Sequence, residues 1–232
     1  LLTPFYVRVF VSGEYGQISE LYAWIALLLA ILTFGMETTF FRFSQKEDSR
    51  KVFNNAETLV LLISTVFLLF YCFFYKSFAE LIHYEFNTHY VLLLGIIVAV
   101  DAAAAIPFAM LRKENKAGRF SLIKTINVLT NIFFNILFLV IIPEKSMMIA
   151  EHIFGQQTSL LIWVFISNIL ASVLNLILLA PQLSTLKISL NKELIVPMLR
   201  YSFPILLISL VGMINEVADK ILIKYLVTIP DA

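Results

Sequence analysis

The chain has 232 residues, of which 60% are hydrophobic and 14% are charged, and its formal net charge is +1. Soluble domains contain about 25% charged residues, so this composition indicates a membrane protein. So small a net charge gives no sign of a nucleic-acid partner, and none is expected. The single cysteine, Cys72, lies within an apolar run, so the chain forms no internal disulfide.

Long apolar runs divide the chain into membrane spans. A helix needs about 20 apolar residues to cross hydrocarbon, and these runs are continuous rather than alternating as barrel strands would be. The expected spans are 1–12 (the outer part of a helix), 18–43, 52–75, 90–111, 120–142 and 158–180, followed by one that starts near 194. Residues 12–16 are expected to form a turn, 76–89 an amphipathic connection and 143–157 a loop. We interpret the chain, which begins at Leu1, as a piece of a longer protein.

The positive charges fix the expected orientation. The loops 44–51, 112–119 and 182–193, with their flanks, hold 12 Lys and Arg residues, whereas the loops expected on the other face hold 3, namely Arg8, Lys76 and Lys145. Cytoplasmic loops of membrane proteins carry the excess of Lys and Arg. We therefore expect a multi-pass protein of the bacterial inner membrane with these three loops in the cytoplasm.

Two spans carry polar side chains at helical spacing. The first set is Lys124, Asn127, Asn131 and Asn135, and the second is Asn168, Ser172 and Asn175. Steps of three and four residues place each set on one face of its helix. A single Asn can simply join two membrane helices, but stripes on neighbouring helices favour a shared hydrated cavity.

Two carboxylates lie inside expected spans. Asp101 is about midway along its span, where an aspartate costs about 2.5–3.5 kcal/mol on insertion scales. It is either a site for proton or cation coupling, or a structural salt bridge or protonated carboxyl. Glu37 has the same two interpretations, and because it precedes Arg42 by about one turn, a structural pair is the simpler one.

No motif in the chain points to catalysis. The three histidines, His83, His89 and His152, lie in expected loops without metal-ligand spacing, and there is no nucleophile elbow and no phosphate-binding loop. We expect no enzyme, no metal and no cofactor.

Four segments carry a family resemblance. PFYVRVFVSGEYGQ and FGMETTFFRF resemble the early helices of the Wzx-like oligosaccharide and polysaccharide flippases, a branch of the multidrug/oligosaccharidyl-lipid/polysaccharide exporter superfamily. IPFAMLRKENKAGRFSLIK resembles the family's cytoplasmic loop between the fourth and fifth helices. MLRYSFPILLISLVGMINEVADKILIKYL resembles the start of its second half.

The resemblance implies an all-α fold of two six-helix lobes around a central cavity. Residues 1–181 would be the first lobe with a truncated first helix, 182–193 a cytoplasmic linker, and 194–232 the start of the second lobe. The implied function is to move undecaprenyl-diphosphate-linked oligosaccharide repeats across the membrane by alternating access, for O-antigen, capsule or exopolysaccharide synthesis. The partners would be this substrate, membrane lipids and other polysaccharide-assembly proteins.

The resemblance also suggests roles for particular side chains. The Asn and Ser stripes would contact the sugars, and Arg8, Arg42 or Lys124 the diphosphate. Proton or sodium coupling, typical of the superfamily, would use Asp101 or Glu37. Two alternatives stay open: a drug exporter of the same superfamily, whose cavity would be more apolar and aromatic, and a membrane polymerase or ligase of the same pathway.

Overall fold

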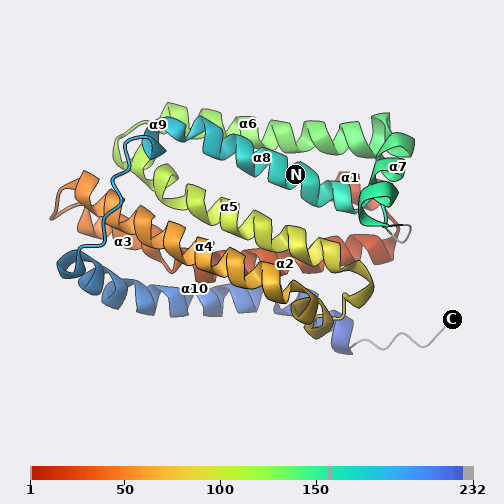
Figure 1. Ribbon diagram of the computed structural model, residues 1–232, viewed down its shortest axis with the longest axis horizontal. Coiled ribbons are helices and arrows are strands. Elements are labelled where there is room, and N and C mark those ends of the chain that lie inside the picture. Colours follow the sequence, from red (N-terminus) through yellow and green to blue (C-terminus); the bar gives the residue numbers. More distant parts are fainter. Residues whose placement is uncertain (1, 156–157, 227–232) are drawn as a thin grey trace.

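The computed structural model describes residues 2–155 and 158–226, and all regular structure in those residues is helical. The long helices run side by side along the length of the molecule (Figure 1). In chain order the elements are α1 (Thr3–Val9), α2 (Ser12–Thr33), α3 (Met36–Phe43), α4 (Ser49–Leu81), the 3-10 turn η1 (Glu85–Asn87), α5 (Thr88–Lys113), α6 (Ala117–Ile136), the π segment η2 (Leu137–Ile141), α7 (Pro143–Phe154), α8 (Ile162–Leu178), α9 (Ala180–Leu183) and α10 (Lys192–Leu226).

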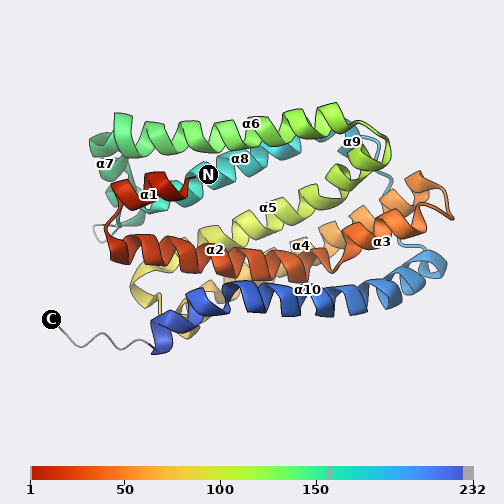
Figure 2. The same cartoon turned by 180° about the vertical axis from the view of Figure 1, so that it is seen from behind.

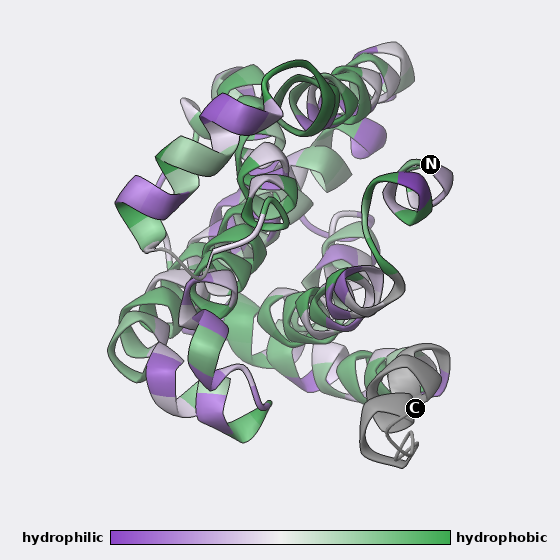
Figure 3. Cartoon of the chain, turned by 90° about the vertical axis from the view of Figure 1, so that its right-hand side faces the viewer, coloured by the Kyte–Doolittle hydropathy of each residue, from purple (hydrophilic) through white to green (hydrophobic). Residues whose placement is uncertain are grey.

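Five of the helical stretches in the described part of the chain are long and apolar enough to cross a membrane. They are Gly13–Phe43, Ser49–Leu81, Glu85–Lys113, Ala117–Ile141 and Lys192–Asn215, and α8 is a shorter apolar helix. Green, apolar residues dominate these helices in Figure 3. The expected all-helical, multi-pass membrane fold is therefore confirmed.

Two predictions about connections were wrong. Residues 12–16 form the first turns of α2 rather than a loop, and Gly13 and Gly16 have open space around them. Residues 143–154 form α7, and Pro143 is its first residue. Backbone N–H groups in the first turn of a helix have no hydrogen-bond partner within the helix, so the N–H that proline lacks is not missed there. Local polarity suggested loops at both places, but an amphipathic helix satisfies its backbone equally well.

The expected span 18–43 consists of two helices. Phe34 and Gly35 both take positive φ, 50° and 63°, which ends α2 and starts α3. A Cβ on Gly35 would lie 2.9 Å from Cγ2 of Ile205 and 3.2 Å from the carbonyl oxygen of Ser202, both on α10. Glycine at position 35 thus permits both the left-handed backbone conformation and the close approach of α10.

The centre of the molecule is α5. It lies between α8 on one side and α2 and α4 on the other (Figures 1 and 2), and it packs against all three. Its buried residues extend from Tyr90 to Leu111, and the helix continues through Pro107. Small residues such as Gly95 and Ala102 let the neighbouring helices approach closely.

The three basic loops gather at one end of the bundle, on the left in Figure 1. Arg50 joins all three, since its guanidinium lies 3.7 Å from the Glu114 carboxylate and donates a 2.7 Å hydrogen bond to the Thr185 hydroxyl. We call this the basic end. The connections α1–α2 and α4–α5, together with α7, lie at the opposite end.

Candidate functional site

A group of four charged side chains joins α3, α5 and α6, and we call Glu37, Asp101, Arg112 and Lys124 the charge cluster. Arg112 donates to the Glu37 carboxylate in a close ion pair. Lys124 interacts electrostatically with Asp101 and Glu37, and with Arg112. The two carboxylates singled out in the sequence therefore both lie within electrostatic reach of Lys124.

Aromatic rings hold the two cations of the cluster. The Arg112 guanidinium lies 5.2 Å from the ring centroid of Phe41 and 5.4 Å from that of Phe120. Lys124 Nζ lies 4.1 Å above the centroid of Phe108. Such contacts favour a cation by about 0.5–2 kcal/mol and fix its position.

The expected pairing of Glu37 with Arg42 was wrong. Glu37 bonds to Arg112 because α3 packs against α5, and Arg42 instead lies over the ring of Tyr201 on α10, 4.9 Å from its centroid. Sequence spacing favoured a neighbour on the same helix, whereas helix packing supplied a closer cation from another.

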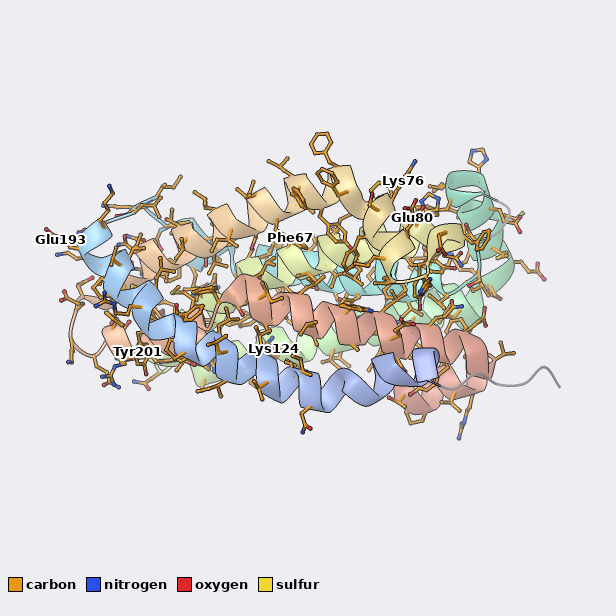
Figure 4. All side chains as sticks on the ribbon, turned by 90° about the horizontal axis from the view of Figure 1, so that it is seen from below. Phe67, Lys76, Glu80, Lys124, Glu193 and Tyr201 are labelled. Atoms are coloured by element: carbon orange, nitrogen blue, oxygen red, sulfur yellow. The ribbon has the colours of Figure 1, made fainter. Side chains whose placement is uncertain are left out.

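The cluster is open on one side. The side chains of Glu37 and Arg112 are 45% and 37% exposed, and Lys124 is exposed as well. Figure 4 labels Lys124 partway along the bundle, between Glu193 at the basic end and Lys76 and Glu80 towards the other end. Charged side chains facing hydrocarbon at such a position are disfavoured by several kcal/mol, so this face suits water or a polar ligand.

A polar chain links the cluster to α8 and α2. Asp101 lies close enough to Ser172 for their side chains to interact. The Ser172 hydroxyl also donates to Asn168 Oδ1 at 3.3 Å, and Asn168 Nδ2 donates to the Tyr22 hydroxyl at 3.0 Å. Ser172, Asn168 and Tyr22 thus form a hydrogen-bonded path from α8 to α2, and Asp101 on α5 lies beside its Ser172 end.

The other end of the α6 stripe joins α1. The Tyr6 hydroxyl donates to Asn135 Oδ1 at 3.1 Å, and Asn135 Nδ2 donates to the Asn131 side-chain and carbonyl oxygens, both at 2.9 Å. Asn135 is fully buried, while Asn127 and Asn131 are half-buried. Asn135 therefore joins α6 to α1 by a hydrogen bond, whereas the half-buried Asn127 and Asn131 remain partly accessible.

The remaining predicted residues lie apart from the cluster. Arg8 is exposed on α1, towards the opposite end (Figure 1). Asn175 is buried, and its Oδ1 has no hydrogen-bond partner among the described residues. The structure thus brings Asp101, Lys124, Asn168 and Ser172 together and leaves Arg8 and Arg42 outside; the roles of all these residues stay predictions.

Besides Arg112, sequence reasoning missed Tyr6, Tyr22 and Glu57. Tyr6 and Tyr22 complete the polar networks, and no pattern in a single sequence marks a tyrosine for that role. Glu57 on α4 is fully buried, and both its carboxylate oxygens lack a hydrogen-bond partner in the described structure. Its position five residues inside an expected span could have drawn attention to it.

Comparison with known proteins identifies the family. The family model described as "Polysaccharide biosynthesis protein" matches residues 1–231, so the chain belongs to this Wzx-like family of polysaccharide biosynthesis membrane proteins. A search of curated proteins and a search of solved structures found no match.

Proposed function

Since the chain belongs to the polysaccharide biosynthesis family and crosses the membrane repeatedly, we propose that it is part of a lipid-linked oligosaccharide flippase. The complete protein would move undecaprenyl-diphosphate-linked repeats across the bacterial inner membrane by alternating access. Residues 1–181 would form its first lobe, 182–193 the linker and 194–232 the start of the second lobe. The basic end would face the cytoplasm.

The observation that carries this proposal is the open side of the charge cluster. An exposed Glu–Arg pair and an exposed Lys on membrane-spanning helices suit a hydrated cavity between two lobes. A lipid-linked sugar can leave its tail in the bilayer while its polar headgroup occupies such a cavity. The accessible amides of Asn127 and Asn131 would bond to the sugars.

Lys124 is the best candidate to bind the diphosphate. Arg112 already pairs with Glu37, and Arg42 lies over Tyr201. Lys124 has only electrostatic and ring contacts, and no salt bridge among the described residues. An ammonium with free donors binds phosphate oxygens without first breaking an ion pair.

Asp101 is the proposed coupling site, because its protonation state would decide which neighbour receives the hydrogen bond of the Ser172 hydroxyl. A serine hydroxyl has one proton, so Ser172 can donate to Asn168 or to ionised Asp101, but not to both. When Asp101 is protonated it becomes the donor, and Ser172 keeps its bond to Asn168. Loss of that proton would redirect Ser172 and break the path to Tyr22, which links proton binding to the packing of α5, α8 and α2.

The test replaces each residue in the complete protein and measures surface glycan together with membrane abundance. We expect Asp101→Asn to abolish glycan display at normal abundance. Lys124→Ala should reduce display severely if Lys124 binds the diphosphate, and a weaker effect would remove Lys124 from that role. Glu151→Gln, an exposed carboxylate on α7, is the matched control and should display normally. Normal display by the Asp101→Asn variant would remove Asp101 from the coupling role.

The same strains separate the alternatives. A drug exporter would show altered drug susceptibility with intact glycan. Loss of a polymerase would leave single repeat units on the surface, and loss of a ligase would leave lipid-linked repeats on the outer side of the membrane. Loss of all surface repeats, with lipid-linked repeats accumulating inside, is the result that supports a flippase.

A further inference from the structure

Glu57 is the buried carboxyl group that the charge cluster does not use. It lies on the third turn of α4, it is fully buried, and neither of its oxygens has a hydrogen-bond partner in the described structure. Asp101, by contrast, has Ser172 and Lys124 beside it. A buried, unpartnered acid needs a physical explanation.

The neighbours of Glu57 on α4 hold the chain that leads into α10. Asn54 Oδ1 accepts from the Lys187 backbone N–H at 3.1 Å, Thr58 Oγ1 from Ser189 at 3.2 Å, and Asn55 Oδ1 from Asn191 at 2.7 Å. We call these three hydrogen bonds the linker clamp. Alternate residues of an extended segment thus bond to one side of a helix, and Glu57 lies one turn after Asn54 and next to Thr58.

An ionised Glu57 is incompatible with this arrangement. A carboxylate removed from water without a partner is strongly destabilising, by more than three net hydrogen bonds can offset. A metal ion would need several oxygen ligands, and the described residues contain no group of three or more His, Cys, Asp or Glu side chains able to hold one. With the clamp closed, Glu57 is therefore a neutral, protonated acid.

Among the described residues, no cation is positioned to keep Glu57 ionised. The ionisable residues on the elements packed against α4 near the basic end are Glu37, Arg42, Asp101, Arg112 and Lys113 on α3 and α5, and Lys187, Lys192, Glu193, Arg200 and Tyr201 on the linker and α10. None of them forms a hydrogen bond or salt bridge with Glu57. The ionisable residues of α2 and η1, which also pack against α4, include Glu20 and Glu85.

The linker is the least protected segment beside the Glu57 turn of α4. Its residues 186–191 have no helical structure, and most are exposed, including Ile188 at 86%. The helix α4 itself packs along its length against the buried helix α5. Segments with few buried contacts open at the lowest free-energy cost, so water reaches Glu57 by release of the linker rather than by separation of α4 from α5.

We propose that Glu57 is a proton-binding site that controls the linker clamp. With its proton bound, the clamp is closed; when the proton leaves, the carboxylate draws in water and the 187–191 segment leaves Asn54, Asn55 and Thr58. Since α10 begins at Lys192, directly after the clamp, release frees the start of α10 from α4. This proton site is separate from Asp101 and does not depend on the substrate of the protein.

The test measures the clamp distance directly as a function of pH. In the full-length protein with Cys72→Ser, spin labels are attached at two exposed positions, Lys46 beside α4 and Ile188 on the linker, and distances are recorded in lipid nanodiscs. We expect one short distance at acidic pH and a second, longer distance that grows as pH rises. Glu57→Gln, which mimics the protonated acid, should keep the short distance at every pH.

Three variants make the result specific. Glu47→Gln, an exposed neighbour, and Asp101→Asn should both retain the wild-type transition. Asn54→Ala removes one clamp bond, which makes release easier, so the midpoint should fall by about 0.7 pH unit, a fivefold change in proton affinity. Membrane abundance of each variant reports its folding.

The proposal is overturned by a wild-type distance that does not change with pH, or by a transition that survives in Glu57→Gln. If Glu57→Gln does not reach the membrane, Asn54→Ala decides: an unchanged midpoint overturns the proposal, and a lowered one supports it.

Discussion

Gly95→Ala tests the packing at the centre of the bundle. A Cβ on Gly95 would lie 2.2 Å from Cδ1 and 2.3 Å from Cε1 of the Tyr71 ring, so α5 and α4 can adopt their present spacing only with glycine here. The ring cannot turn aside freely. Its hydroxyl donates a buried 2.8 Å hydrogen bond to the Val91 carbonyl oxygen, and the ring packs against Phe67 and Phe78.

The magnitude follows from what the ring must give up. Breaking the Tyr71–Val91 bond in a buried site costs about 1–3 kcal/mol, and each disturbed aromatic pair about 0.5–1.5 kcal/mol. Alanine returns about 0.5–1 kcal/mol through its better helix propensity. We expect a net loss of about 2–4 kcal/mol, equivalent to a fall in melting temperature of roughly 5–15 °C for a chain of this size.

The assay is thermal unfolding of the purified full-length protein in one detergent. Gly16→Ala in α2 is the matched control, because open space surrounds its Cβ position, and it should melt at or slightly above the wild-type temperature. The Tyr71→Ala background provides the second comparison, since removal of the ring should make Gly95→Ala nearly neutral. An unchanged melting temperature for Gly95→Ala, or an equal loss in the Tyr71→Ala background, would refute the contact.

Two further predictions use the same melting assay. Gly35→Ala should lose about 1–3 kcal/mol, because alanine resists the φ of 63° and its Cβ would press on Ile205; Gly212→Ala, with open space around it, is the control, and equal effects would contradict the contact with α10. Tyr6→Phe should lose about 1–2 kcal/mol by leaving Asn135 Oδ1 without its donor, and Tyr6→Phe with Asn135→Leu should lose less than the sum of the single changes; strict additivity would contradict the bond.

Composition and apolar run length were sufficient to predict the helical membrane fold, because a membrane requires every backbone group to bond within its own helix or a closed barrel. The position of the basic loops at one end was also predictable. Two expected spans separate each basic loop from the next, so the chain returns to the same end each time. The break at Gly35 was not predictable with the same ease. A glycine in a long apolar run is compatible with an unbroken helix, and the contact that requires it comes from Ile205, 170 residues later in the chain.

The candidate site was predictable in its residue types but not in its pairings. Helical spacing correctly grouped Asn168 with Ser172 on one face, and the structure connects them by a hydrogen bond. The partners across helices depend on how each helix is rotated about its axis and on the angles at which the helices cross. Neither can be derived from a single sequence. For that reason Glu37 was assigned to Arg42 on its own helix, whereas its actual partner is Arg112 on α5.

The contrast between Asp101 and Glu57 separates two uses of a carboxyl group in a membrane helix. Asp101 has a hydroxyl partner and a nearby ammonium group, so both its charge states have partners and it can exchange a proton without opening the bundle. Glu57 has neither, so only its neutral state is compatible with the closed clamp. Under the two proposals, exchange at Asp101 would alter hydrogen bonds within the site, whereas exchange at Glu57 would require movement of the linker. If both proposals hold, Asp101→Asn will stop glycan display while leaving the pH dependence of the clamp distance intact, and Glu57→Gln will fix the clamp distance while leaving the bonds around Asp101 unchanged.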